Sequence, residues 1–269
     1  MNRPAAFAGV FYPGHPGTLR RMINGWLPKK PVKKTDAIAC VLPHAGYVYS
    51  GAVAARTLAS VVLPDVYVIL APNHTGDGPD ASIMTEGVWT TPFGDVPVHS
   101  ELARALLERS TYLEEDDIAH AQEHAIEVQL PLIQALRTQP FSIVPIVLAS
   151  IGNLVYKDIA SAIASAIRGK TPRALVIAST DLTHYEPQPL ANKKDDIAIQ
   201  AMLRRDNDGL VRAVREHSIS MCGALPAATA LCAANLLGAK KARLIAYQTS
   251  GDVTKDYSAV VGYAGLVIE

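Results

Sequence analysis

The feature that most constrains the fold of this chain is the alternation of short apolar runs with longer segments of helical periodicity. The runs are bounded by Gly, Pro or Asp and most are rich in Val and Ile; they cover Ala37–Leu42, Val66–Ala71, Ser142–Leu148, Ala174–Ala178, Arg243–Tyr247 and Ala259–Ile268. Strands that are covered on both faces lose the two-residue alternation of polar and apolar side chains. We therefore expect these runs to be buried strands.

Helical patterns lie between the runs. They cover Gly51–Val61, Ser100–Ser110, Glu123–Arg137, Leu154–Arg168, Lys193–Arg205, Gly209–His217 and Pro226–Leu237. Alternating strands and helices predict an α/β sandwich in which helices flank a mostly parallel central sheet. The chain has 269 residues, of which 49% are hydrophobic, enough to bury one large core. We expect a single domain over residues 1–269.

Two segments depart from this alternation. Ile83–Asp95 is expected to form a hairpin-like excursion in which Trp89 and Phe93 wall a pocket, and an edge hairpin that caps the core is an equally good interpretation. Tyr112–Gln122 contains four consecutive acidic residues and is expected to be a solvated loop.

Charge and motifs exclude several classes of protein. Lys plus Arg and Asp plus Glu both number 25, and no long basic tract is present, so nucleic acid is not an expected partner. No apolar stretch is long enough to predict a membrane span or a secretion signal, and we expect a cytoplasmic protein with reduced cysteines. The motifs of P-loop NTPases, serine hydrolases and zincins are missing from the sequence.

Three histidines follow apolar runs and lie beside turn-forming residues: His44, His74 and His184. The carboxyl ends of parallel strands meet at one edge of a sheet, so these side chains are expected to share one cleft. Neutral imidazole suits iron, copper and zinc, and two rigidly held histidines supply half of a four-coordinate site. A third ligand is therefore required.

Cys222 is a plausible third ligand. It precedes a helical pattern in which Pro226 suits the first turn, and the dipole of a helix N-terminus favours a thiolate. Cys40 lies within a predicted strand and Cys232 within a predicted helix, so both are expected to be small buried hydrophobic side chains.

Asp181 precedes His184 by three residues. Its carboxylate is expected either to fix the tautomer of an imidazole or to cap a following helical turn, and the sequence does not separate the two. His184 is expected to be a metal ligand or a general acid/base, because its ordinary pKa lies near neutral pH.

Other polar residues flank these positions. His124 and Glu127 are three residues apart on one predicted helix, and we expect that face to look into the cleft, with His124 contacting substrate or a metal-binding residue. We likewise expect three other side chains either to hold a metal-binding residue in place or to contact a substrate: Tyr47, Asn73 and Glu127.

Several of these stretches together resemble the Memo family, whose microbial members are called AmmeMemoRadiSam system protein B. The matching stretches are Phe7–Pro13, Pro43–Tyr47, Pro72–His74, Glu123–Pro131, Ser179–His184 and Cys222–Gly223, so the resemblance runs from about residue 5 to the end of the chain. Memo proteins are similar in fold to class III extradiol dioxygenases, which are non-haem iron enzymes that open catechol rings.

The resemblance implies that His44, His74 and Cys222 hold a metal ion, with Asp181 and His184 beside it. Extradiol enzymes use two histidines and a carboxylate, and a thiolate in the third position shifts the preference towards copper or altered iron chemistry. Fe(II) is the expected cofactor, with Cu or Zn as alternatives.

The resemblance leaves two hypotheses of different classes. The first is a redox, dioxygenase-like metalloenzyme that acts on an unidentified small molecule. The second is a metal-carrying or peptide-binding module without turnover. Human-type members recognise phosphotyrosine peptides, but Leu182-Thr183, between Asp181 and His184, adds no cysteine, tryptophan or histidine that would suggest peptide recognition.

Overall fold

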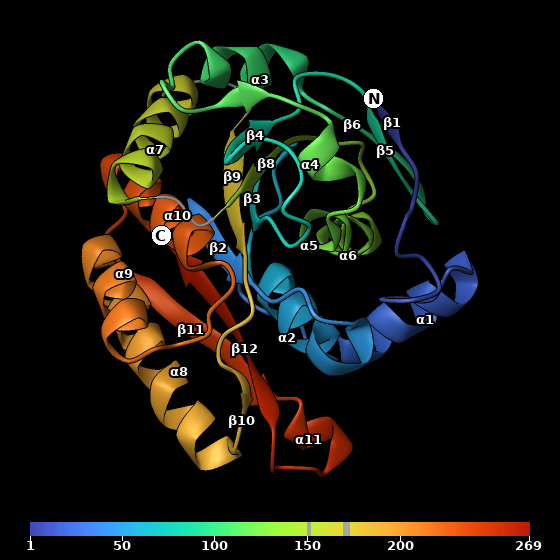
Figure 1. Ribbon diagram of the computed structural model, residues 1–269. Helices are drawn as coiled ribbons and strands as arrows, with labels where there is room; N and C mark the ends of the chain where they lie inside the picture. The colour runs from blue at the N-terminus through green and yellow to red at the C-terminus, as the bar shows by residue number, and fades with distance from the viewer. Residues whose placement is uncertain (150–151, 169–172) are drawn as a thin grey trace.

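A central sheet with helices on both faces dominates the computed structural model, which describes residues 1–149, 152–168 and 173–269 (Figure 1). Its strands are β2 (Ala39–Leu42), β3 (Val66–Pro72), β4 (Ala81–Ile83), β7 (Glu114–Glu115), β8 (Ser142–Leu148), β9 (Ala174–Ser179), β10 (His184–Glu186), β11 (Ala242–Thr249) and β12 (Val260–Ile268). The order is β10-β12-β2-β9-β3-β8-β4-β7, and β11 also pairs with β12. All six predicted strands are present.

The centre of the sheet is parallel and its flanks are not. β2, β9, β3 and β8 pair in parallel, whereas β12 pairs antiparallel with β2 and β4 pairs antiparallel with β8. β11 and β12 are also antiparallel, as their short connection allows. The predicted α/β class is confirmed, and the parallel pairing belongs to the four central strands.

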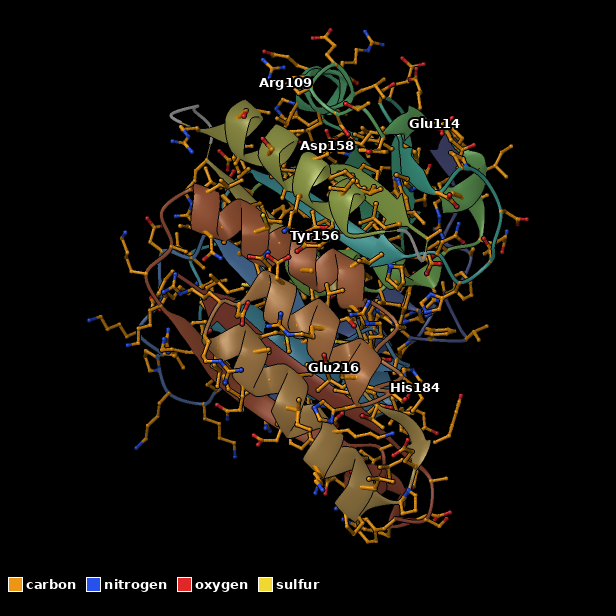
Figure 2. All side chains as sticks on the ribbon, turned by 60° about the vertical axis from the view of Figure 1, so that its left-hand side comes forward. Arg109, Glu114, Tyr156, Asp158, His184 and Glu216 are labelled. Carbon is orange, nitrogen blue, oxygen red and sulfur yellow. The ribbon has the colours of Figure 1, made fainter. Side chains whose placement is uncertain are left out.

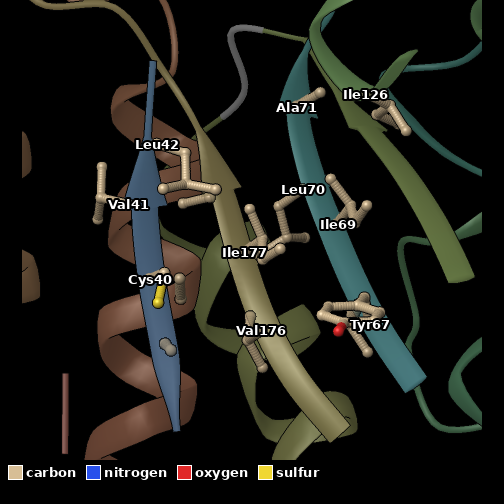
Figure 3. Close-up of a cluster of buried hydrophobic side chains, with 14 of the residues drawn as sticks. Cys40, Val41, Leu42, Tyr67, Ile69, Leu70, Ala71, Ile126, Val176 and Ile177 are labelled. Atoms are coloured by element: carbon tan, nitrogen blue, oxygen red, sulfur yellow. The ribbon is translucent and has the colours of Figure 1, made fainter. Parts of the chain in front are cut away.

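The core lies on both sides of these central strands. Every residue of β2, β3 and β9 is buried, and Figure 3 shows their side chains packed from strand to strand. Burial on both faces explains why the sequence of each strand reads as a continuous apolar run.

The helices are α1 (Pro16–Trp26), α2 (Tyr47–Ala59), α3 (Ser100–Leu107), α4 (Ile118–Ala121), α5 (His124–Glu127), α6 (Gln129–Leu136), α7 (Asn153–Ile167), α8 (Gln188–Leu203), α9 (Asn207–Glu216), α10 (Ala224–Leu236) and α11 (Gly251–Thr254). In Figure 1, α7 and α10 cover one face of the sheet, and α2, α5 and α6 lie on the other. None of the described helices is long and apolar enough to cross a membrane.

Some boundaries differ from the prediction. The predicted helix Glu123–Arg137 is two helices, α5 and α6, which meet at Val128. Helix α2 begins at Tyr47 and α8 at Gln188, in both cases before the predicted start. Helix α1 was not predicted, because only two of its side chains, Leu19 and Ile23, are buried and its apolar signal is weak.

The Ile83–Asp95 segment leads into a hairpin, but its aromatic side chains wall no part of the histidine cleft. β5 (Val88–Thr91) and β6 (Gly94–Pro97) pair antiparallel and form a separate sheet with β1 (Asn2–Arg3). Trp89 is fully buried beneath the guanidinium of Arg3, and Phe93 packs against Arg20. The interpretation as a hairpin that caps the core fits. Phe93 lines a separate pocket of about 450 Å³ together with Arg20, and neither aromatic side chain lines the histidine cleft.

The Tyr112–Gln122 segment is only partly the solvated loop that we expected. Glu114 and Glu115 are exposed, but they form the short edge strand β7. Ala119 and His120, in α4, are fully buried. The prediction is therefore wrong for the second half of this segment.

Candidate metal centre

The three predicted histidines line one cleft of about 620 Å³. His44 and His74 lie in the loops that follow β2 and β3, as the strand-end argument requires. His184 does not lie in such a loop, because it is the first residue of β10, which pairs with β12 at the edge of the molecule (Figure 2).

His44, His74 and Cys222 converge at the wall of this cleft, which the two histidines line and Cys222 does not. One potential ligand atom from each side chain lies within 4.8 Å of the other two, and Cys222 Sγ is 3.3 Å from His44 Nε2. Cys222 belongs to the segment before α10, whereas the two histidines follow β2 and β3. The chain thus brings two imidazoles and one thiol together from three separate segments.

Hydrogen bonds around Ser179 fix the tautomer of His44. The single proton of Ser179 Oγ is donated to the carbonyl oxygen of Ala125 at 2.7 Å, and Gln129 Nε2 donates to the same hydroxyl at 3.0 Å. His44 Nδ1 is 3.0 Å from that oxygen and must therefore carry the proton and donate it. The lone pair of neutral His44 is left on Nε2, which faces Cys222.

His74 is oriented by a buried carboxylate that the sequence analysis missed. Glu123 accepts hydrogen bonds from the backbone N–H of His74 at 2.7 Å and from its Nδ1 at 2.9 Å. Burial by itself would raise the pKa of Glu123, but the hydrogen bonds that it accepts from His74 help to outweigh burial, and the pKa is lowered to about 2. The ionised carboxylate holds the proton of His74 on Nδ1 and leaves Nε2 free.

His124 extends the cluster of imidazoles. Its ring stacks on His74 at 4.5 Å between centroids, and Phe11 covers it at 4.4 Å. Burial, reinforced by the neighbouring histidines, lowers the pKa of both His44 and His124 to about 3. Both rings are therefore neutral at pH 7, which is the form that binds a metal ion. His74, Glu123 and His124 also form a second potential ligand set.

The surroundings of Cys222 favour the thiol over the expected thiolate. Burial, followed by the nearby carboxylate of Asp181, raises the pKa of Cys222 to about 12. Cys222 lies before the first turn of α10, and one backbone N–H, from Asp181 at 3.3 Å, contacts its sulfur. Cys40 is fully buried as expected, whereas Cys232 is only partly buried.

Asp181 and His184 share the cleft without bonding to each other. Asp181 accepts a hydrogen bond from the backbone N–H of His44 at 2.8 Å, and its other oxygen is 4.0 Å from His44 Nε2. His184 Nδ1 instead donates to the carbonyl oxygen of Ser220 at 2.8 Å. Asp181 does not orient His184, and no helix follows that it could cap, because the next element is β10.

Three further predicted positions do not face the cleft. Glu127 is fully buried in an ion pair with Arg3. The hydroxyl of Tyr47 donates to the carbonyl oxygen of Val128, and Asn73 accepts backbone hydrogen bonds that close the turn after β3. Because none of the three lines the cleft, the structure leaves them the supporting role rather than contact with a substrate: Asn73 closes the turn that carries His74. That supporting role stays a prediction.

Comparisons with known proteins agree with this α/β fold. The family model for Memo-like proteins matches residues 3–267. MEMO1 family proteins of Methanopyrus kandleri and Aquifex aeolicus are 42% and 38% identical, over 99% and 98% of both chains. An uncharacterized protein of Escherichia coli K12 has the same fold, with a TM-score of 0.59 at 12% identity over 86% of this chain and 99% of that chain. The chain belongs to the Memo family.

Proposed function

We propose that this chain is a metal-dependent redox protein that holds one transition metal ion on His44, His74 and Cys222 and acts on a small molecule in the adjoining cleft. Fe(II) is the first candidate, and Cu or Zn are the alternatives. The observation that carries the proposal is the approach of three potential ligand atoms to within 4.8 Å beside a cleft of about 620 Å³.

The donor set fits such an ion. Ser179 and Glu123 hold the protons of His44 and His74 on Nδ1, so a lone pair remains on Nε2 of each ring. Imidazole nitrogen and thiolate sulfur suit iron, copper and zinc, whereas magnesium and calcium prefer oxygen. The Cys222 proton must leave when the sulfur binds. The ion would supply Lewis acidity and, if it is iron or copper, redox chemistry.

His184 is the candidate general acid/base. His184 lines the cleft, and its Nδ1 donates to the carbonyl oxygen of Ser220, so Nε2 is the nitrogen that would exchange a proton with a substrate. Asp181 positions the His44 backbone rather than His184. A cleft of this size has room for a small organic molecule, which supports an enzyme over a carrier that only stores metal.

The two partly buried cysteines provide a matched test of the metal site. Cys222→Ser should weaken metal binding by more than the roughly 10–100-fold that loss of a supporting hydrogen-bond partner costs, whereas Cys232→Ser should leave it unchanged. Competition titrations of Fe(II), Cu and Zn against a chelator measure the change. Equal losses in the two variants would show that Cys222 is not a ligand.

A second pair of variants separates ligation from acid/base chemistry. His44→Ala should lose both the metal and any turnover, because its Nε2 faces Cys222. His184→Ala should keep the metal and lose turnover. The measurements are metal stoichiometry and oxygen consumption with a panel of catechols and other reductants. Loss of metal from His184→Ala would make His184 a ligand and would favour the carrier hypothesis.

A further inference from the structure

The cleft has a second half whose chemistry the metal site does not use. Its inner end holds His44, His74 and His124, and Phe11 covers the ring of His124 there. The wall of its more exposed outer half is lined by Tyr49, from α2, and Tyr185, from β10, and Tyr263 of β12 is a buried lining residue. Aromatic faces of this kind bind flat rings by stacking and organic cations through their π electrons.

Tyr185 is held in this wall at a strained position. Its φ of 58° lies in the left-handed region, which a bulky residue rarely adopts. The cause is a bulge in which His184 pairs with Val261 and Glu186 with Val260, so that Tyr185 is the extra residue. A glycine would adopt this conformation without strain.

The two residues on either side of Tyr185 are held in place, which keeps its backbone in this strained conformation. His184 is held by two hydrogen bonds to Ser220, and Glu186 forms an ion pair with Lys194. The Tyr185 ring is 78% exposed and yet lines the cleft, so it stands at the cleft mouth and not in the core. Backbone strain kept by surrounding contacts is characteristic of residues that clamp a ligand.

The hydroxyls of Tyr185 and Tyr49 accept and donate no hydrogen bond within the part of the chain that the structure describes. Tyr49 is 37% exposed, and its backbone carbonyl oxygen, not its ring, is the atom bound by Gln248. Both rings are therefore available to a molecule that enters the cleft.

The charge of the wall selects among aromatic molecules. The described residues that line the cleft include two carboxylates, Asp181 and Asp256, and neither Lys nor Arg. Lys255 adjoins Asp256 in sequence, but its Nζ donates to the carbonyl oxygen of Asp252. Carboxylate and phosphate ligands are bound mainly by Arg and Lys, so the side chains of this wall disfavour anions. A bound metal ion would itself attract an anion, so the charge of the wall is tested in the metal-free chain.

We propose that the outer half of the cleft binds an aromatic amine in its protonated form, with the ring against Tyr185 and Tyr49 and the ammonium on the side of Asp256. The inference rests on the proposed function, because it names the substrate class of the same site. It assigns Tyr185 and Asp256 as binding residues.

Three phenols that differ mainly in charge test this proposal: tyramine, 4-ethylphenol and 4-hydroxyphenylacetate. Their affinities for the full chain are measured by NMR titration after metal removal by a chelator, and the expected order holds for that state. A second titration after loading with zinc measures what the bound ion adds to the binding of the carboxylate. In the metal-free chain, tyramine should bind about threefold or more tightly than 4-ethylphenol, and 4-hydroxyphenylacetate should bind most weakly. Binding of the acid as tight as that of the amine in that state, or no binding of any of the three, overturns the proposal.

Variants identify the residues. Tyr185→Gly removes the ring and the strain, so tyramine binding should fall about threefold or more while the melting temperature stays the same or rises. Tyr185→Phe should retain binding. Tyr112→Ala removes another exposed tyrosine, which lies outside the cleft, and should change nothing. Unchanged tyramine binding by Tyr185→Gly contradicts the proposal.

The charge argument has its own variant. Asp256→Asn should abolish the preference for tyramine over 4-ethylphenol and leave the binding of 4-ethylphenol unchanged. A preference that survives in Asp256→Asn contradicts the assignment of that carboxylate. Metal titration of the same samples keeps the two proposals separate. A chain that selects tyramine but binds no metal refutes only the proposed function. A chain that binds metal but does not select tyramine refutes only the aromatic-amine site.

Discussion

At the residue scale, one hydroxyl proton decides which nitrogen of His44 can bind a metal ion. Ser179 gives its proton to Ala125, so the hydroxyl can only accept from the His44 ring. If Ser179 is removed, nothing in this arrangement holds the proton of His44 on Nδ1, and the tautomer with Nε2 protonated becomes accessible. That tautomer has no lone pair towards Cys222.

Ser179→Ala should therefore weaken metal binding by about 10–100-fold, the usual effect of losing a partner that orients a ligand. Ser60→Ala is the matched control, because Ser60 is also a buried serine whose hydroxyl donates to a backbone carbonyl oxygen, that of Thr57. Chelator competition measures the affinities, and ¹⁵N NMR of the His44 ring reports the tautomer. Full affinity in Ser179→Ala, with an unchanged ring spectrum, would disprove the role of the hydroxyl.

The same scale shows what sequence can and cannot assign. His44, His74 and Cys222 could be selected because their types and turn positions are themselves chemical signals. Glu123 and Glu127 could not be told apart, since both flank His124 on one helix. Their roles depend on distant partners: His74 lies 49 residues from Glu123, and Arg3 lies 124 residues from Glu127.

At the element scale, the N-terminal segment is part of the construction of the site. Glu127, in α5, binds Arg3, the hydroxyl of Tyr12 at 2.5 Å and the backbone N–H of Phe7 at 2.9 Å. The Arg3 guanidinium also donates to the carbonyl oxygen of Glu123 at 2.8 Å. These contacts fasten the segment that carries Phe11 to the single-turn helix that carries His124.

The ion pair between Arg3 and Glu127 should consequently be critical for stability. Arg3→Met leaves an unpaired buried carboxylate and should lower the free energy of unfolding by about 3–5 kcal/mol. Arg104→Met breaks an exposed pair with Glu86 and should cost only about 0–1 kcal/mol. Urea unfolding measures both. The double variant Arg3→Met/Glu127→Gln removes the unpaired charge and keeps an acceptor for Tyr12 and Phe7, so it should recover part of the loss. Similar costs for the two single variants would contradict this account.

Strands were easier to predict than helices for a physical reason. β3 and β8 are buried almost throughout, so apolar composition alone marks them and their predicted ends are within one residue of the observed ones. Helix starts depend on local capping. Glu123 caps α5 by accepting from the N–H of Ala125, and a new helix begins at Gln129, which periodicity cannot show.

At the scale of the whole molecule, strand order could not be derived from the sequence, because buried apolar runs are interchangeable. β2 pairs with β9, in the register Ala39 with Val176, across more than half of the chain. β12 pairs antiparallel with β2, and the amino-acid composition of β12 does not indicate that direction. This order brings the loops after β2 and β3 close to the segment before α10, so that His44, His74 and Cys222 meet.

Because the proposed ligands come from three distant segments, a bound metal ion should tie the folded chain together and have no comparable site in the unfolded chain. A free ion at 100 times its dissociation constant should add about 2.7 kcal/mol to the free energy of unfolding. For a chain of this size that corresponds to a rise in melting temperature of roughly 5–10 °C. Differential scanning fluorimetry with and without Zn measures the rise.

The His44→Ala variant is the control for this measurement. Zn should raise its melting temperature very little, and the comparison with and without Zn is made within the variant, so its own stability does not matter. An equal rise in His44→Ala would place the stabilising metal elsewhere, with the set formed by His74, Glu123 and His124 as the next site to examine.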